Sequence, residues 1–218
     1  MPYEKNRISP FYASYYWFLC PKFTTDPISP EGQRLIQLLD ASGVEHLWIK
    51  GYHVNWETGE SLKPYTSDIN KHTHCSAFAP AFAKKVGVHL LNPTEKSESR
   101  KKGSLADYQY DWLKSGEGDS NGWKPVSTAF DAENEANKGN LVVVVYKSDD
   151  FSNPGHIAIV RPAVKTQKQI EREGTQVTQA GGTNAYDITL REGFRHHPLA
   201  WPNGVIFYEH SIDWASIK

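Results

Sequence analysis

The sequence predicts an α+β fold in which helices from the first half of the chain pack on an antiparallel sheet from the second half. The helix start and stop signals fall before residue 140, and runs of β-branched and aromatic residues follow it. Such a separation of helices from strands is typical of the α+β class. With 218 residues, 39% of them hydrophobic, the chain is long enough to bury one sizeable core.

Three helices are predicted, and each is closed by a glycine, the residue that most readily adopts the left-handed conformation at a helix end. They begin at Pro30, near Cys75 and near residue 126, and they end at Gly43, Gly87 and Gly139. Ser29 is suited to cap the first helix, because its hydroxyl can accept a hydrogen bond from a free amide of the first turn. Proline at the first helical position agrees with this start.

Four strands are predicted in the second half of the chain. They are "NLVVVVY" (140–146), "HIAIVRP" (156–162), "TQVTQAG" (175–181) and "GVIFYEH" (204–210). Two other regions have no such pattern: residues 44–66 read as loops and short strands, and residues 93–125 are polar. We expect Trp112 and Trp123 of the polar region to anchor it to the core rather than to line a glycopeptide groove. Residues 1–28 predict an arm packed on the body.

The composition excludes several classes of protein. A formal net charge of −1 gives no electrostatic basis for binding nucleic acid or an anionic membrane. No run of about 18 apolar residues predicts a membrane span, and "FYASYYWFL" (11–19) lacks the charged leader and cleavage site of a signal peptide. The two cysteines, Cys20 and Cys75, are too few for a disulfide framework or a four-cysteine zinc site. One disulfide between them stays open.

Cys75 is the first candidate for chemistry, because it stands where the second predicted helix begins. The free amides and the positive end of the helix dipole stabilise a thiolate there, which predicts a lowered pKa. The same amides can hold an oxyanion after the thiolate has attacked a carbonyl. A cysteine nucleophile also needs a base, and the base needs a third group that orients it.

His156 and Gln179 are the candidates for these two roles. His156 is the first residue of a β-branched strand, where a side chain is rigidly mounted and still reachable. Gln179 is a polar residue inside another predicted strand. If the two strands pair, the Gln179 amide oxygen can accept the imidazole Nδ1–H and fix the tautomer of the ring. Taken singly, each of the three residues is more often structural.

A metal site is the alternative for "HTHC" (72–75). His72, His74 and Cys75 lie close in sequence, but structural zinc takes four ligands, usually in spaced pairs. A fourth ligand would have to come from a distant histidine, namely His53, His89 or the pair His196 and His197. We expect no metal and no organic cofactor, and we expect the pair before Pro198 to lie at the surface.

The motifs together resemble the NlpC/P60 superfamily of papain-like cysteine peptidases and amidases, which act on bacterial cell-wall peptides. "HCSAF" (74–78), "GNLVVVV" (139–145), "GHIAIV" (155–160) and "TQAGG" (178–182) follow in the order of the family motifs. The resemblance covers about residues 60–190. It implies a papain-like core with N-terminal helices packed on an antiparallel sheet, in a catalytic domain of residues 61–218. Residues 1–60 would then be an extension packed on that core, in one compact unit.

The resemblance also implies roles for particular residues. Cys75 would be the nucleophile, His156 the base and then the acid, and Gln179 the orienting group, with Asn184 as its alternative. Besides Asn184, three more residues are implied to bind substrate: Tyr65 beside the thiolate, Ser76 at the mouth of the acyl-side pocket, and His74, which stands where the family usually has an acid.

The implied activity is hydrolysis of an amide bond in a peptidoglycan stem peptide or cross-bridge through a thioester. Two alternatives keep the same fold: a protein acyltransferase or deamidase with the same triad, and a non-catalytic module that binds cell wall or glycan. We expect a monomer, and whether an immunity or inhibitor protein exists is open. A periplasmic or secreted location is favoured only by the implied substrate.

Overall fold

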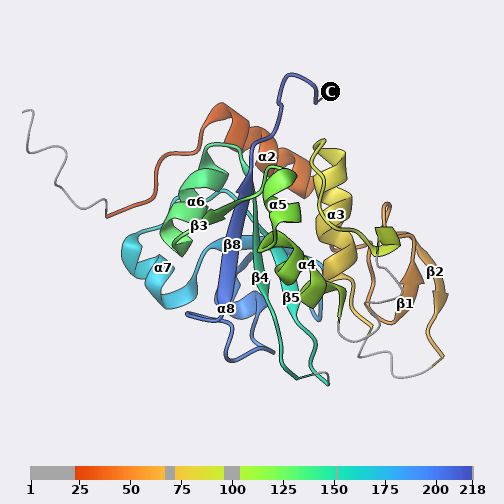
Figure 1. Cartoon of the computed structure of the whole chain (residues 1–218). Coiled ribbons are helices and arrows are strands. Elements are labelled where there is room, and N and C mark those ends of the chain that lie inside the picture. Colours follow the sequence, from red (N-terminus) through yellow and green to blue (C-terminus); the bar gives the residue numbers. More distant parts are fainter. Residues whose placement is uncertain (1–22, 67–71, 96–103, 151, 218) are drawn as a thin grey trace, which may run out of the picture.

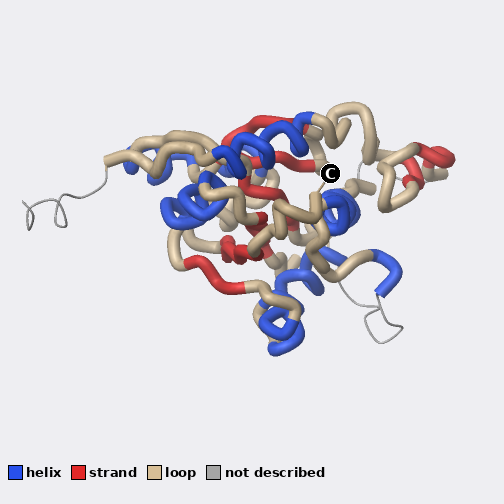
Figure 2. Tube along the Cα trace, turned by 90° about the horizontal axis from the view of Figure 1, so that it is seen from above, coloured by secondary structure: helices blue, strands red, loops and turns tan. Residues whose placement is uncertain are grey.

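The structure is a computed structural model that describes residues 23–66, 72–95, 104–150 and 152–217, and it is an α+β fold with helices on both faces of one large sheet (Figures 1 and 2). Six strands form this sheet in the order β3-β8-β4-β5-β6-β7, and every neighbouring pair is antiparallel. The strands are β3 (Lys124–Val126), β4 (Leu141–Tyr146), β5 (His156–Val160), β6 (Gln176–Gln179), β7 (Ala185–Thr189) and β8 (Val205–His210). The α+β prediction is therefore confirmed.

The helices divide between the two faces of the sheet. On one face, α2 (Pro30–Asp40), α3 (Cys75–Lys85) and α4 (Leu105–Leu113) share a core cluster with the side chains of Val143, Ile157 and Ile159. On the other face, α6 (Ala129–Asn137), α7 (Gln167–Glu173) and α8 (Leu190–Gly193) pack with Val144, Ala158 and Val160. Side chains alternate between the faces of a strand, so β4 and β5 are buried on both sides and read as continuous hydrophobic runs. The described part also contains α5 (Gly116–Ser120) and the 3₁₀ turn η2 (Pro93–Glu95).

The predicted helix starts follow from the capping chemistry. The Ser29 hydroxyl accepts a hydrogen bond from the Gly32 amide, and α2 begins at Pro30 as predicted. The second helix begins at Cys75, also as predicted. The third begins at residue 129 rather than 126, because Thr128 caps it by accepting from the amide of residue 131. The four predicted strands are all present, each trimmed by one or two residues at its ends.

Two helices of the structure, α4 and α7, were not predicted from the sequence. Helix α4 falls within residues 93–125, and Ser104 and Asp107 form a capping box at its start. Helix α7 falls within residues 163–176 and begins with a second capping box, between Thr166 and Gln169. A capping box stabilises a short helix because it provides hydrogen-bond acceptors for the free amides at the helix start. In the same polar region, Trp112 and Trp123 are buried in the α3–α4 core and so anchor it as expected.

The predicted boundary between residues 60 and 61 falls inside a hairpin. Strand β1 (Tyr52–Val54) pairs antiparallel with β2 (Ser61–Pro64) in a separate two-stranded sheet, which projects from the body beside α3 (Figure 1). Leu35 and Leu39 of α2 belong to the same core cluster as α3. The two predicted parts therefore share one core. Residues 1–22 of the predicted arm lie outside the described residues.

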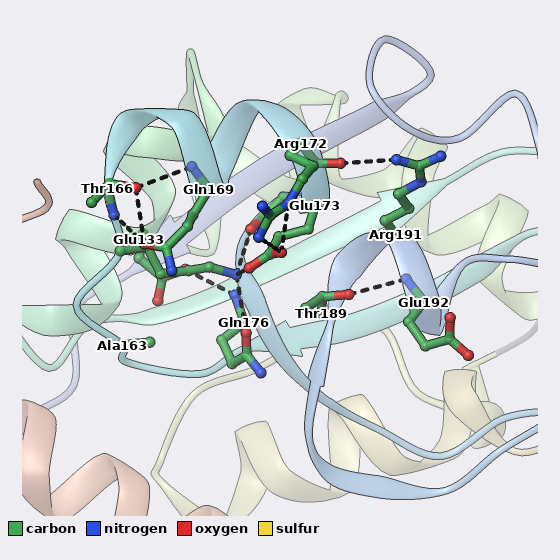
Figure 3. A network of polar contacts seen from close by, with 12 residues as sticks. Glu133, Ala163, Thr166, Gln169, Arg172, Glu173, Gln176, Thr189, Arg191 and Glu192 are labelled. Atoms are coloured by element: carbon green, nitrogen blue, oxygen red, sulfur yellow. Dashed lines mark hydrogen bonds and ion pairs between the residues drawn. The ribbon is translucent and has the colours of Figure 1, made fainter. Parts of the chain in front are cut away.

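A buried polar network lies between α6, α7 and β6, as Figure 3 shows around Glu133 and Gln176. One carboxylate oxygen of Glu133, Oε2, accepts the Gln176 backbone N–H at 2.9 Å, while Oε1 has no hydrogen-bond partner among the described residues. The Lys165 ammonium group donates to the Gly174 carbonyl at 2.9 Å and pairs with Glu173 at 3.1 Å. Because Glu133 is fully buried, desolvation raises its pKa to about 8.

Candidate active site

Cys75 is the first residue of α3 and is a free thiol that is 5% exposed. Burial raises the pKa of this thiol, and this effect exceeds the opposite effect of the Ile157 and Ser76 backbone amides, which lower it. The expectation of a lowered pKa at the helix start was therefore wrong. A helix N-terminus stabilises a thiolate by a modest amount, whereas removing the thiolate from water costs more. The possible disulfide partner, Cys20, lies outside the described residues.

His156 and Gln179 come together because β5 and β6 are neighbouring antiparallel strands. His156 is the first residue of β5 and Gln179 is the last residue of β6. Because the two strands are antiparallel, both residues lie at the same end of the strands. The ring Nε2 is 2.9 Å from the Gln179 Oε1. The contact is therefore made through Nε2, and the expectation of Nδ1 was wrong. The Gln179 amide nitrogen donates to the Thr183 carbonyl at 2.9 Å, which turns its oxygen toward the ring.

This contact determines which ring nitrogen can act as a base. The Gln179 oxygen accepts a hydrogen bond, so Nε2 carries the proton and Nδ1 keeps its lone pair. The edge of the Phe194 ring lies against the imidazole, with 4.6 Å between the ring centroids. Burial lowers the pKa of His156 to about 4, although the Gln179 hydrogen bond acts in the opposite direction. The ring is therefore neutral near pH 7 and able to accept a proton.

The thiol and the imidazole approach the start of β5 from opposite faces of the sheet. Cys75 belongs to the core cluster on the α3 face together with Ile157, whereas Phe194, which contacts His156, belongs to the cluster on the α6–α8 face. Gln179 is the only hydrogen-bond partner of the His156 ring within the described residues. The thiol and the ring thus lie near the start of β5 against opposite faces of the sheet, without a hydrogen bond between them.

A cavity of about 570 Å³ opens at this end of β5. It is lined by His156 and Gly155 at the start of β5, by Thr73 just before α3, and by His196 and His197. Cys75 is not among the lining residues, in agreement with its burial. The cavity therefore gives access to the imidazole. It also reaches Thr73, which lies two residues before Cys75 and just before the helix.

The three residues implied to bind substrate make contacts of their own. The Tyr65 ring is stacked between the rings of His53 and His72, with centroid distances of 3.8 and 3.6 Å. The His74 Nε2 is 2.8 Å from the Tyr52 carbonyl oxygen, and burial lowers the pKa of His74. These contacts fasten the β1–β2 hairpin to the segment before α3. The carbonyl of Ser76 accepts a hydrogen bond from the Gln109 side chain at 3.0 Å.

Asn184 has a different position from the one that the alternative triad requires. Its side-chain oxygen accepts the Gly181 amide, and its nitrogen donates to the Val44 and Leu47 carbonyls at 2.8 Å each. It therefore clamps the β6–β7 turn to the loop after α2. Gln179, not Asn184, contacts His156.

The metal alternative receives no support from the part of the chain that the structure describes. That part contains no group of three or more histidine, cysteine, aspartate or glutamate side chains arranged to hold an ion. The rings of His53 and His72 face Tyr65 instead. Over the same residues, no helix is long and apolar enough to cross a membrane.

His197 is a site residue that the sequence did not reveal, since we expected it at the surface. It is half-buried, its ring lies 6.0 Å from that of His156 at an angle of 16°, and its buried Nδ1 has no partner in the described chain. Burial, with a smaller contribution from His156, lowers the pKa of His197 to about 4. Its neighbours in "FRHHPLAWP" (194–202) carry no pattern that could have marked it.

A scan against protein-family models and a search of curated proteins found no match to this chain.

Proposed function

We propose that the protein is a cysteine amidase or endopeptidase that uses Cys75, His156 and Gln179. The observation that carries the proposal is the buried hydrogen bond between His156 and Gln179 at the edge of the sheet, beside a helix whose first residue is a cysteine. A neutral imidazole with one nitrogen held by an amide oxygen is the form that a cysteine nucleophile needs in its base.

The proposed reaction proceeds through a thioester. The Nδ1 of His156 takes the thiol proton as the Cys75 sulfur attacks the amide carbonyl, and the free amides at the start of α3 hold the oxyanion. The imidazolium then protonates the leaving amine, and the carbon–nitrogen bond breaks. Water, deprotonated by His156, releases the acid and restores the thiol. In the described conformation the Cys75 thiol and the His156 ring lie against opposite faces of the sheet, so the reaction requires a conformational change that brings the sulfur to the imidazole.

The proposed substrate class is a peptidoglycan stem peptide or cross-bridge. It is supported by the resemblance to the NlpC/P60 superfamily in "HCSAF", "GHIAIV" and "TQAGG", and by the order of a cysteine helix before two strands that bear His156 and Gln179. A papain-like core is proposed on the same grounds.

The direct test is digestion of purified peptidoglycan, with the soluble fragments analysed by mass spectrometry. We expect fragments from the wild type and none from a Cys75→Ala variant, and their masses identify the bond that is cut. Several wall types should be used, because cross-bridges differ between them. If the wild type releases nothing that the variant does not, the hydrolase proposal fails. Release of ammonia or transfer of an acyl group would indicate the deamidase or acyltransferase alternative.

One observation favours a second candidate function, a non-catalytic module that binds cell wall. The Cys75 thiol is buried and burial raises its pKa, as is usual for a structural cysteine. This candidate predicts that the protein sediments with insoluble peptidoglycan without releasing fragments, and that Cys75→Ala sediments equally well.

Gly193 offers a test of the role of Gln179 that leaves all three proposed catalytic residues in place. A methyl group on Gly193 would meet the Gln179 Oε1, so Gly193→Ala should push the amide away from His156. We expect kcat/KM for wall peptides to fall about 10- to 100-fold, because small displacements at a catalytic centre have large effects. Gly116→Ala is the matched control, since nothing lies within 4 Å of its added carbon. Unchanged activity in Gly193→Ala at normal stability would contradict the role of Gln179.

A further inference from the structure

A second cavity, of about 590 Å³, lies behind the candidate active site. It is bounded by α7, by α8 and by the loop that follows α8. Its lining combines three arginines and two glutamates, Glu171 and Glu192, with aromatic rings: Arg172, Arg191, Arg195, Phe194, His197 and Trp201. Such a combination suits a ligand that has an anionic group on an apolar body.

This cavity is a neighbour of the His156 cavity. His197 lines both of them. Phe194 lines the second cavity, and its ring lies against His156 with a centroid distance of 4.6 Å. One side chain therefore separates the second cavity from the imidazole. The second cavity is therefore the one next to the imidazole on the side of Phe194 and His197.

The arginines of this cavity differ in their partners. Arg172 pairs with Glu173 at 2.8 Å, and Arg195 pairs with Glu192 at 2.9 Å. Arg191 donates only to the Arg172 carbonyl oxygen, at 3.3 Å, and has no carboxylate partner among the described residues (Figure 3). Its side chain is exposed, and the other N–H donors of its guanidinium group are open to a ligand. Arg191 is thus the arginine of this cavity that forms no ion pair among the described residues.

The proposed chemistry determines which part of the substrate, on one side of the scissile bond, lies next to His156. A base that has taken the thiol proton delivers it to the leaving amine, so the amine part of the substrate lies on the side of His156. The second cavity adjoins that side. A group bound there therefore belongs to the leaving-amine part of the substrate.

We propose that the cavity is a subsite for a carboxylate on the leaving-amine part of the substrate, and that Arg191 binds this carboxylate. This inference rests on the proposed hydrolysis, because that reaction places the leaving-amine part of the substrate beside His156. The substrate class is then an acylated amino acid or short peptide whose free carboxylate follows the scissile amide closely. Trp201 and Pro198 supply apolar contacts for its side chain.

The test is binding to the Cys75→Ala protein, which needs no catalysis. The probes are acetyl-L-lysyl-D-alanyl-D-alanine and the same peptide ending in a carboxamide, titrated by calorimetry. We expect the carboxylate peptide to bind at least about tenfold more tightly, as is typical of a charge-assisted bidentate pair, and we expect Arg191→Gln to abolish that difference. Arg34→Gln is the matched control, because Arg34 also donates to backbone carbonyls but lies on α2.

The outcomes separate this inference from the hydrolase proposal. Equal binding of the two peptides, no binding of either, or a preference that persists in Arg191→Gln would overturn the carboxylate subsite. A carboxylate preference that depends on Arg191 supports the subsite even if the wild type releases no fragments from peptidoglycan. In that last case the hydrolase proposal alone fails.

Discussion

Replacing His156 by alanine is expected to lower kcat/KM for wall-peptide hydrolysis by about 10³-fold or more, close to the loss in Cys75→Ala. The reason is that a buried thiol whose pKa is raised by burial is almost entirely protonated near neutral pH. Without a base beside it, few nucleophiles form. The proposed mechanism makes the thiol and the imidazole act as one unit, so the double variant should be about as inactive as either single variant. The measurement is steady-state hydrolysis of a peptide identified by the digestion experiment.

The pH profile of the wild type provides the control for this prediction. Burial lowers the pKa of His156 to about 4, so the imidazole stays neutral down to that pH. We expect the acid limb of kcat/KM to lie near pH 4 to 5, well below the ordinary histidine pKa of 6.5. An acid limb at 6.5, or a His156→Ala variant that retains a tenth of the activity, would show that His156 is not the base.

Replacing Glu133 by glutamine is expected to stabilise the protein by about 3 kcal/mol at pH 7 and by almost nothing at pH 4.5. Burial raises the pKa of this carboxyl from 4.5 to about 8, so the folded protein holds a proton that the unfolded chain releases. Its contribution to stability is therefore fully present below pH 4.5 and is lost as the pH rises through 8. Each pH unit above 4.5 costs about 1.4 kcal/mol, which gives the figure at pH 7.

Glutamine suits this test because it has the shape of the protonated acid and keeps an acceptor for the Gln176 amide. Urea unfolding at pH 4.5 and at pH 7 measures the difference between the two proteins, in which the titration of all other groups cancels. Glu117→Gln, at an exposed position of α5, is the control and should change little at either pH. An equal gain at both pH values would mean that ionisation of Glu133 is not the cause.

Local chemistry explains which parts of the fold were predictable from the sequence. The start of α2 follows from one serine before a proline, and β4 and β5 follow from continuous β-branched runs. Helices α4 and α7 were missed because they are short and lie between polar stretches, although their capping boxes at Ser104 and Thr166 were legible in the sequence. Strand β7 was missed because its burial is partial and irregular along the strand.

Only the part of the candidate site that follows from the pairing of strands could be predicted from the sequence. Once β5 pairs with β6, a residue at the start of one strand meets a residue at the end of the other, which brings His156 to Gln179. Which ring nitrogen makes the contact depends on the side-chain rotamer, and the pKa of Cys75 depends on burial. Neither is encoded in local sequence. His197 reaches the site through a loop after α8, whose path depends on tertiary packing.

The Asn184 clamp bears on how far this chain can be shortened. The segment it holds, around Val44 and Leu47, belongs to the first 60 residues, and the turn it belongs to follows Gln179 directly. A truncation that begins at residue 61 would leave two hydrogen-bond donors of Asn184 without acceptors and would free the turn next to the His156 partner. A minimal active fragment must therefore retain the loop after α2, even though that loop contributes no side chain to the proposed chemistry.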